Sequence, residues 1–491
     1  MHLCRGCTVG AGYMRSRAAP NALTMYVVGC PPNAGRPITL TRNDPMRRSL
    51  LLPVLFLALA VPNAMAQEEL LQSGPMLGYS DMFEVLLWAQ TTEPAEVKVV
   101  YWDLEAPDAR METEAVATTK AAGYAAKLIA DEVQPGRLYG YELHINGENV
   151  ERPYRLEFQT QVLWQWRTDP PDFRIATGSC FYVNDAPYDR PGDPYGGGFE
   201  ILDAMVDKDA DAMVWLGDNF YYREPDWNTR TGMIYRNTHT RSYPGLQPLL
   251  ASTHHYATWD DHDYGPDNSD WAWREKATAR EVFDMFWGNP ELGPPELGGS
   301  IATRFEWGDV EFFLLDNRWF RSSEHRLSGH KQVFGEKQLQ WLVDALTYSR
   351  ASFKIIVSGG QILNPVADWD SYATYPEERA RFLQLLREND VWGVVLLSGD
   401  VHYTVLSKLD RRGTYPLWEI TTSPITAGPA SVDPDNYDNH LAEPGTLFVE
   451  RNFATLDFSG PENDRVMNVT VWDAAGAELW SKQIRARELR P

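Results

Sequence analysis

Beyond residue 172, apolar strand-like segments that end in reactive side chains constrain the fold more than any other feature of this chain. The segments FRIATGSC, DAMVWLGDNFYY, HYATWDDHD, VEFFLLDNR, FKIIVSGGQ and GVVLLSGDVH alternate with helical patterns such as GEKQLQWLVDALTYS and PEERARFLQLLREN. Strands that are apolar along their whole length are covered on both faces, as in α/β proteins. The pattern predicts an α/β domain over residues 172–487, with ligands bound at the carboxyl ends of its strands.

These strand ends concentrate carboxylate, imidazole, phenol and thiol groups. If they meet at one edge, five aspartates share a pocket: Asp218, Asp260, Asp261, Asp263 and Asp400. Carboxylates a few ångströms apart do not all stay ionised unless protons or cations balance them. A mixture of oxygen, nitrogen and sulfur donors favours a cluster of metals over a single ion. A lone Gly-Asp strand end is equally compatible with a simple turn, but four reactive endings in one domain favour a site.

The sequence before residue 168 follows a different pattern. From Leu70 to Gln165 it runs in short alternating stretches, among them MFEVLLWAQ, AEVKVVYWD and YGYELHING, separated by Pro, Gly, Asp and Glu. This alternation predicts a β-sandwich of the immunoglobulin or fibronectin III type over residues 67–167. The TDPPD segment at 168–172 is the expected linker, because two prolines cannot continue a strand ladder.

Residues 46–66, MRRSLLLPVLFLALAVPNAMA, have the pattern of a secretory signal peptide. Arg47 and Arg48 precede about a dozen mostly apolar residues and an A-x-A site, and this apolar run is shorter than the ~20 residues that span a bilayer. We expect a true start at Met46, cleavage before Gln67, and export to the periplasm or the medium by the Sec or twin-arginine route. No later segment is apolar for long enough to span a membrane.

Removing residues 1–66 changes the charge and the cysteine content. The full chain has a formal net charge of −23; the leader holds seven arginines and one aspartate, so the remainder carries 38 basic and 67 acidic residues, a net charge of −29. So acidic a surface repels a nucleic-acid backbone, and we expect no nucleic-acid readout. Cys180 is then the single thiol of an exported protein, either a buried apolar residue or a ligand.

The ordered set GSC, GDNFYY, WDDHD, LLDNR and LSGDVH, preceded by a β-sandwich, resembles the alkaline phosphatase D (PhoD-like) family of secreted metallophosphatases. The resemblance extends over about residues 70–485, and the order of the motifs carries it. It places the chain in the metallophosphoesterase superfamily, which includes the purple acid phosphatases and has a four-layer αββα sandwich fold. It implies an alkaline phosphatase or phosphodiesterase that hydrolyses phosphoesters at a multinuclear metal site. The bulk negative charge favours small phosphoesters, because it slows the encounter with polyanionic substrates. Partner proteins stay unknown.

The resemblance also implies a set of metal ligands: Cys180, Asp218, Tyr221, Asp261, Asp400, His402 and Asn268. Cys180, Tyr221 and His402 would bind iron, with Tyr222 as an alternative phenol. Asp218 would bridge the metals, Asp261 would take a second, calcium-like metal, Asp400 would bind on that side, and Asn268 resembles a polar position nearby. Charge-rich thiolate, phenolate and carboxylate donors favour Fe³⁺ over Mg²⁺, with calcium or another divalent ion beside it.

Three further residues are expected to act on the substrate. His262, oriented by Asp263, would protonate the departing alkoxide; the family commonly has Glu where this chain has Asp263, which reaches less far. Arg318 is a candidate phosphate clamp, because a guanidinium meets two phosphate oxygens at once. A salt bridge to Asp316 or to another strand-end carboxylate is its alternative role. A metal-bound hydroxide would then attack phosphorus in line, without a phosphoenzyme.

Two other functions stay open at this point. One is a catalytically inactive relative that serves as a metal-binding surface module. The other is a glycoside hydrolase that uses two strand-end carboxylates as acid and base, which leaves Cys180, Tyr221 and both histidines unexplained. Gly196–Gly198 lacks the spacing of a dinucleotide or P-loop motif, and no G-x-S-x-G elbow supports a serine hydrolase.

Overall fold

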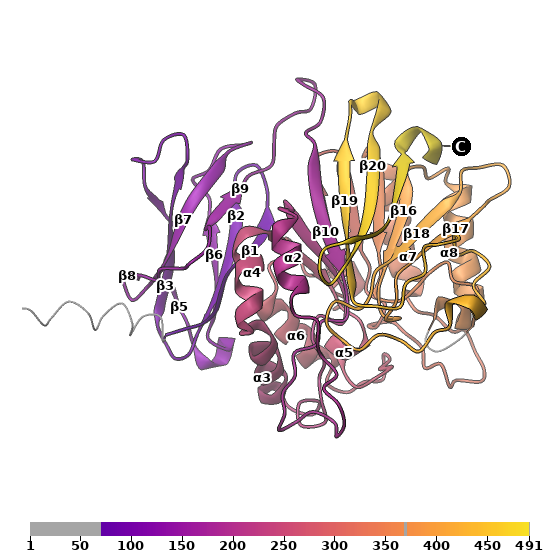
Figure 1. The fold of residues 1–491 in the computed structure, drawn as a ribbon, viewed down its shortest axis with the longest axis horizontal. Coiled ribbons are helices and arrows are strands. Elements are labelled where there is room, and N and C mark those ends of the chain that lie inside the picture. Colours follow the sequence, from indigo (N-terminus) through magenta and orange to yellow (C-terminus); the bar gives the residue numbers. More distant parts are fainter. Residues whose placement is uncertain (1–69, 368–370, 491) are drawn as a thin grey trace, which may run out of the picture. The chain divides into compact units, whose positions relative to one another are not determined.

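The computed structural model describes residues 70–367 and 371–490 (Figure 1). The expected leader, the start at Met46 and the cleavage site before Gln67 lie outside the described residues. Within the described ranges, no helix combines the length and the apolar character needed to cross a membrane.

A nine-stranded sheet carries most of the fold, in the order β21-β20-β19-β10-β11-β12-β1-β2-β6. Its parallel centre consists of β10 (Phe173–Gly178), β11 (Ala212–Leu216) and β12 (His254–Thr258). The antiparallel strands on one side are β19 (Asn452–Ser459), β20 (Val466–Asp473) and β21 (Glu478–Arg485). On the other side lie β1 (Leu71–Ser80), which pairs in parallel with β12, and then the antiparallel strands β2 (Val85–Thr91) and β6 (Ala125–Ala130).

A second sheet has six strands in the order β13-β14-β15-β16-β18-β17. They are β13 (Thr303–Trp307), β14 (Val310–Leu314), β15 (Phe353–Val357), β16 (Val394–Ser398), β17 (Val405–Leu409) and β18 (Leu417–Thr421). The four inner strands are parallel, and the two edge strands are antiparallel to them. The inner strands are fully buried, as their largely apolar sequences predict, and this burial includes the charged residues Glu311, Lys354 and Glu419.

The two sheets pack face to face, and helices cover their outer faces (Figure 1). Along β11, Val214 faces the core between the sheets, whereas Met213 and Trp215 face the helices. The helices on the nine-stranded sheet are α2 (Ile201–Asp207), α3 (Arg230–Arg241), α4 (Gln247–Ser252) and α6 (Lys276–Phe286). Those packed with the six-stranded sheet are α7 (Gly335–Tyr348) and α8 (Pro376–Glu388). The fold is therefore a mixed α/β sandwich.

The N-terminal strands are joined to this sandwich. Strand β1 pairs in parallel with β12, with Leu77 opposite His254, so β1, β2 and β6 continue the large sheet. A smaller sheet packs against them around its own apolar core; its strands are β3 (Glu96–Asp103), β4 (Met111–Glu112), β5 (Val116–Ala117), β7 (Leu138–Ile145), β8 (Glu148–Asn149) and β9 (Glu157–Gln159). The domain boundary at residues 167–172 and the immunoglobulin or fibronectin III likeness stay predictions.

Candidate metal centre

The carboxyl ends of strands from both sheets meet at one place. Three groups of side chains each offer ligand atoms that lie within 4.8 Å of one another: Cys180, Asp218 and His402; Asp218, Asp261 and His262; and Asp260, Asp261 and Asp400. These residues follow β10, β11, β12 and β16 in the sequence. Because Asp218 and Asp261 each belong to two groups, the three groups form one continuous cluster.

Left-handed backbone conformations orient several of these side chains. The residues with positive φ include Cys180 (60°), Asp218 (51°), Asp400 (71°) and His402 (59°). Non-glycine residues rarely adopt this region, and they persist there mainly at functional sites. Gly217 has a φ of 93°, and a Cβ there would lie 2.8 Å from the backbone nitrogen of Asp260. Glycine therefore lets the ends of β11 and β12 approach closely.

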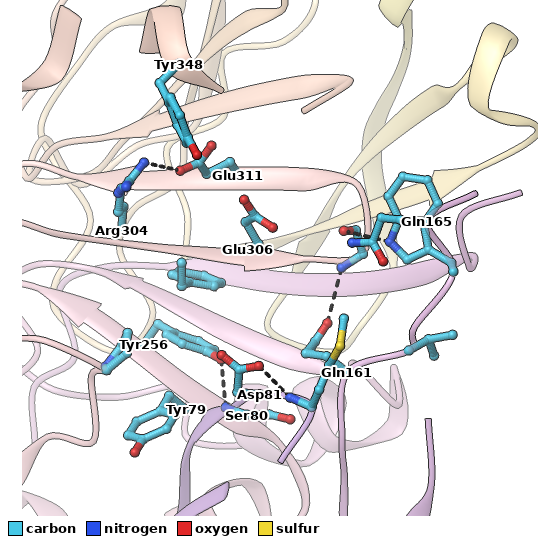
Figure 2. A pocket seen from close by; sticks show the side chains of 16 residues that line it. Tyr79, Ser80, Asp81, Gln161, Gln165, Tyr256, Arg304, Glu306, Glu311 and Tyr348 are labelled. Carbon is cyan, nitrogen blue, oxygen red and sulfur yellow. Dashed lines mark hydrogen bonds and ion pairs between the residues drawn. The ribbon is translucent and has the colours of Figure 1, made fainter. Parts of the chain in front are cut away.

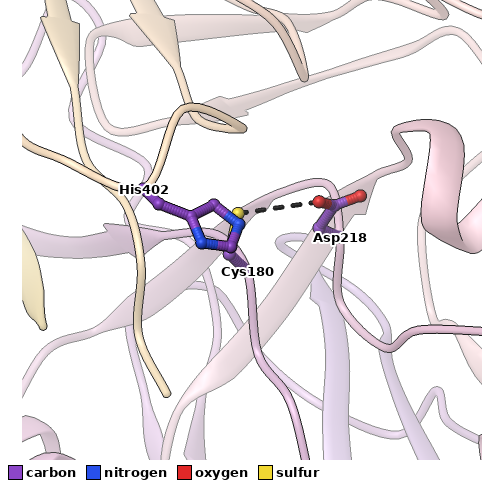
Figure 3. A group of neighbouring side chains, drawn as sticks. All are labelled: Cys180, Asp218 and His402. Atoms are coloured by element: carbon purple, nitrogen blue, oxygen red, sulfur yellow. Dashed lines mark hydrogen bonds between the residues drawn. The ribbon is translucent and has the colours of Figure 1, made fainter. Parts of the chain in front are cut away.

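Figure 3 shows the group that contains sulfur. The buried Cys180 thiol lies 3.6 Å from Asp218 Oδ2, and its sulfur accepts a hydrogen bond from Ser423 Oγ at 3.1 Å. Burial raises the pKa of the Cys180 thiol. The sulfur therefore keeps its proton unless a metal ion takes the proton's place.

His402 presents a lone pair to the cluster. Its Nδ1 lies 2.5 Å from the carbonyl oxygen of Gly428, and its Nε2 lies 3.2 Å from the Tyr221 hydroxyl. Since a carbonyl oxygen only accepts, Nδ1 carries the proton and Nε2 is left as the acceptor. Burial lowers the pKa of His402, which keeps the ring neutral. A backbone partner on the far nitrogen is typical of a histidine that binds a metal.

The two tyrosines of GDNFYY point in different directions. The Tyr221 ring centroid lies 4.2 Å from that of His262, and its hydroxyl contacts His402. The Tyr222 hydroxyl instead accepts from Asn237 Nδ2 at 3.3 Å, and its ring belongs to the core beneath the helices. Tyr221 is thus the phenol that reaches the cluster.

Asp218 and Asp261 are buried carboxyl groups whose pKa values shift in opposite directions. Burial raises the pKa of Asp218 well above its ordinary value, and the charge of Asp261 raises it further. Burial acts in the same direction on Asp261, but His262 and Arg318 lower its pKa below the ordinary value. Asp261 Oδ2 accepts a hydrogen bond from the backbone N–H of Asn268 at 2.6 Å, whereas Oδ1 accepts no hydrogen bond from the described residues. A buried carboxylate oxygen of this kind suits a cation.

This donor set fits metal ions. It combines a thiol, a phenol and a neutral imidazole with carboxylates that two groups share. The expected ligands Cys180, Asp218, Tyr221, Asp261, Asp400 and His402 are all at the cluster. Asp260 and His262 also lie in the ligand groups, although they were not expected as ligands. Asn268 reaches the cluster through its backbone amide, and a side-chain role for it stays a prediction.

Asp263 does not orient His262, contrary to expectation. Its Oδ1 accepts a hydrogen bond from the backbone N–H of Asn219 at 2.8 Å. Its Oδ2 accepts the backbone N–H of Asp260 at 2.9 Å, which caps the short helix α5 (Asp261–Tyr264). Consecutive helical residues point in different directions, so Asp263 cannot face the ring that precedes it. A different carboxylate does so: Asp267 Oδ1 lies 3.6 Å from His262 Nε2.

Arg318 adopts the salt-bridge alternative. Its side chain is 0% exposed, and both Nε and Nη2 contact Asp260 Oδ1. Asn317 Nδ2 donates to the same oxygen at 2.7 Å, and Arg318 Nη2 lies 3.8 Å from Asp261 Oδ1. This arrangement fixes the ends of β12 and β14 to each other, and the clamp role stays a prediction.

Sequence reasoning missed two residues beside the cluster. Arg223 lies with its guanidinium carbon 5.5 Å from the Tyr221 ring centroid, and its charge adds to the effect of burial in lowering the pKa of His262. The Tyr195 hydroxyl lies 3.4 Å from His402 Nδ1. Arg223 directly follows GDNFYY, which was the available signal. Nothing in the sequence around Tyr195 distinguishes it from an ordinary loop tyrosine.

A separate hollow of about 300 Å³ is shown in Figure 2. It is lined by the end of β1, the segment 161–165 and the β13–β14 hairpin, and none of the described ligand residues borders it. Its buried Glu311 pairs with Arg304 at 3.0 Å. Because Glu311 lies at the start of β14 and the cluster lies beyond the other end, this hollow is not part of the candidate centre.

Comparisons with known proteins add a family assignment. A family model described as PhoD-like phosphatase matches residues 176–460, and a domain of unknown function (DUF7800) matches residues 68–163. Alkaline phosphatase D of Bacillus subtilis (strain 168) is 23% identical over 330 residues, which cover 57% of this chain and 53% of that protein. The chain therefore spans only about half the length of this curated relative.

Two solved structures have a similar fold. A structure of PhoD aligns over 83% of this chain and 91% of its own, with a TM-score of 0.66 and 17% sequence identity. Purple acid phosphatase PPD1 from yellow lupin (Lupinus luteus) seeds aligns over 84% of this chain and 74% of its own, with a TM-score of 0.59 and 13% identity. At these identities the likeness is one of fold.

Proposed function

Because the chain belongs to the PhoD-like phosphatase family, we propose that it hydrolyses phosphoesters, as an alkaline phosphatase or phosphodiesterase, at the metal centre described above. The observation that supports this most is the sharing of Asp218 and Asp261 between groups of ligand atoms. Shared carboxylates are suited to a multinuclear centre. Such a centre can offset charge on both the attacking and the leaving oxygen of a phosphoryl group.

We further propose iron and calcium as the metals, with other divalent ions as substitutes for calcium. Cys180, Tyr221 and His402 would bind the iron, and Asp218 would bridge to the second metal. The sulfur and phenol donors support iron. The oxygen donors of Asp261 and Asp400 support calcium, which prefers carboxylates. The role of Asn268 rests on the family resemblance alone.

In this proposal, the metal ions when bound would activate a water near neutral pH and polarise the phosphoryl group. His262 would donate a proton from Nε2 to the departing alkoxide. Its ring packs against Tyr221, which supports its position. Asp267 Oδ1 lies 3.6 Å from Nε2, and its charge opposes part of the lowering of the His262 pKa by burial. The Cys180 thiol is buried and engaged by Ser423, which argues against a covalent intermediate. The proposed reaction is direct displacement by the activated water, with inversion at phosphorus.

We also propose that the protein works after export. The signal-peptide pattern at residues 46–66 supports export by the Sec or twin-arginine route. The net charge of −29 beyond that segment favours small phosphoesters over polyanionic substrates, because like charges slow their encounter at low salt.

The proposed function is tested by the rates at which metal-loaded protein hydrolyses an aryl phosphomonoester and an aryl phosphodiester. Wild-type protein should hydrolyse at least one of them, and Asp218→Asn should lower that rate by more than about 100-fold. Asp438→Asn, which changes an exposed aspartate, is the matched control and should keep the wild-type rate. Wild-type protein that binds metal but hydrolyses neither ester would instead support the inactive surface module.

A further inference from the structure

We propose that Arg223 binds the phosphoryl group of the substrate and holds its nonbridging oxygens beside the metal centre. The proposal rests on the proposed function. It assigns to Arg223 the role that sequence analysis gave to Arg318.

Arg223 is a buried cation without an ion-pair partner among the described residues. Only 5% of the residue is exposed. The acidic side chains close to it in sequence pair with other arginines: Asp226, which also accepts the Arg223 backbone N–H, pairs with Arg236 at 2.8 Å, and Glu224 pairs with Arg190 at 3.1 Å. A buried guanidinium that lacks a counter-ion is costly to the fold unless a ligand supplies the negative charge.

Tyr182 and Asp189 fix the direction of this guanidinium. Arg223 Nε donates to the Tyr182 hydroxyl at 3.1 Å, and that hydroxyl donates to Asp189 Oδ1 at 2.5 Å. The guanidinium carbon lies 4.6 Å from the centroid of the Tyr182 ring. Within the described part of the chain, the two Nη groups form no hydrogen bond. An arginine has five N–H donors, so four of them remain for a ligand.

The guanidinium lies next to the groups that form the metal centre. The Tyr221 ring contacts both Arg223 and the ligand cluster: its centroid is 5.5 Å from the guanidinium carbon, and its hydroxyl is 3.2 Å from His402 Nε2. The same ring packs against His262 at 4.2 Å. A phosphoryl group beside His262 would therefore lie within reach of a long, partly pre-oriented side chain.

The two candidate arginines, Arg223 and Arg318, differ in the groups that already interact with their guanidinium. Arg318 is fully buried and contacts Asp260 through two nitrogens. Arg223 meets two aromatic rings and a neutral hydroxyl, so its charge is still available. A planar guanidinium donates to two phosphate oxygens at once, and it stabilises the charge that grows on them in the transition state.

The test compares Arg223→Gln and Arg223→Lys with wild-type protein, all metal-loaded, using inorganic phosphate as the probe. Calorimetry should show phosphate binding that is about 10-fold weaker or more in Arg223→Gln, and kcat/KM for an aryl phosphomonoester should fall about 100-fold. Arg223→Lys should lie between the two, because an ammonium keeps the charge but not the paired donors. Arg190→Gln, which changes an exposed arginine nearby, should match wild type.

Metal content and unfolding temperature, measured on each variant, separate a local effect from a loss of fold. Phosphate affinity within about twofold of wild type in metal-loaded Arg223→Gln would overturn the proposal. If that variant does not fold, unchanged affinity in Arg223→Lys would overturn it instead. If wild-type protein hydrolyses neither ester but Arg223→Gln still binds phosphate more weakly, the result would support the role of Arg223 and contradict the proposed function.

Discussion

At the scale of single residues, the centre is built from side chains that each have a second contact to fix them. His402 is held through Nδ1 by Gly428 and meets the cluster through Nε2. Cys180 is held by Ser423, and Asp261 by the Asn268 amide. Such supporting contacts orient a metal ligand before the metal binds, and their loss typically weakens metal binding about 10- to 100-fold.

The adjacent tyrosines provide a matched pair of variants. A phenolate bound to Fe³⁺ absorbs visible light, so iron-loaded wild-type protein should have a visible band and iron-loaded Tyr221→Phe should lack it. Tyr222→Phe loses only a hydrogen bond with Asn237, at a cost of about 1 kcal/mol in stability, and should keep the band. The measurement is an absorption spectrum of each purified protein beside its iron content. A visible band retained in Tyr221→Phe and lost in Tyr222→Phe would reverse the assignment.

Single residues also show where sequence reasoning stops. The motif order brought out Cys180, Asp218 and His402, because strand ends in α/β folds converge by rule. The partners of Asp263 and Arg318 depended on helix geometry and on which oppositely charged group lies within reach after folding. Neither follows from spacing along the chain. Adjacency to His262 was therefore a poor guide to what orients its ring.

At the scale of elements, the strand-to-loop turn after β11 positions the bridging aspartate. Gly217→Ala would place a Cβ 2.8 Å from Asp260 N and would also strain a backbone with a φ of 93°. We expect it to lower the free energy of unfolding by more than about 3 kcal/mol and to reduce metal content. Gly413→Ala is the matched control: its φ is 78°, but no atom lies within 4 Å of the added Cβ.

Gly413→Ala should lower the free energy of unfolding by only about 1 kcal/mol, which is the cost of the backbone conformation alone. Chemical denaturation of both variants, with metal content measured in parallel, gives the comparison. Equal losses for Gly217→Ala and Gly413→Ala would mean that the close approach to Asp260 does not matter.

Element prediction succeeded where the pattern was strong. Every strand and helix expected beyond residue 172 is present, from β10 to β16, because long apolar runs and amphipathic repeats specify their own class. The antiparallel strands β19, β20 and β21 were not expected. The left-handed conformations at Cys180 and Asp400 had no sequence signal either, since glycine is the usual marker of that region.

At the scale of the whole molecule, the family resemblance drawn from the motifs is confirmed. The strands β1, β2 and β6 continue the large sheet, and the predicted division into two domains stays a prediction. Strand alternation shows that residues face two environments, and it does not show which neighbour a strand pairs with. His254 lies where β1 joins the large sheet through β12. Its Nδ1 contacts the carbonyl oxygen of Gly78 at 2.8 Å, and its Nε2 accepts a hydrogen bond from the backbone N–H of Gln159 at 3.4 Å.

The buried His254 between β1 and the large sheet should make the stability of the protein depend on pH. Burial lowers the pKa of His254 from 6.5 to about 4. Between these values the unfolded chain takes up a proton that the folded chain does not, so stability falls as pH falls from 6.5 to 4. The full loss is about 3 kcal/mol. His254→Gln should remove this part of the slope, and His440→Gln, at an exposed position, should not. Denaturant titrations over that pH range give the slopes, and parallel slopes for all three proteins would contradict the prediction.

The central claim is that the strand-end cluster is a metal centre that hydrolyses phosphoesters. It is tested most directly by the rate of phosphate release from an aryl phosphomonoester as metal is removed by chelation and then restored, with metal per chain measured at each step. The account predicts more than one metal ion per active chain, and a rate that falls with chelation and returns with iron and calcium. Full activity in metal-free, folded protein would contradict it.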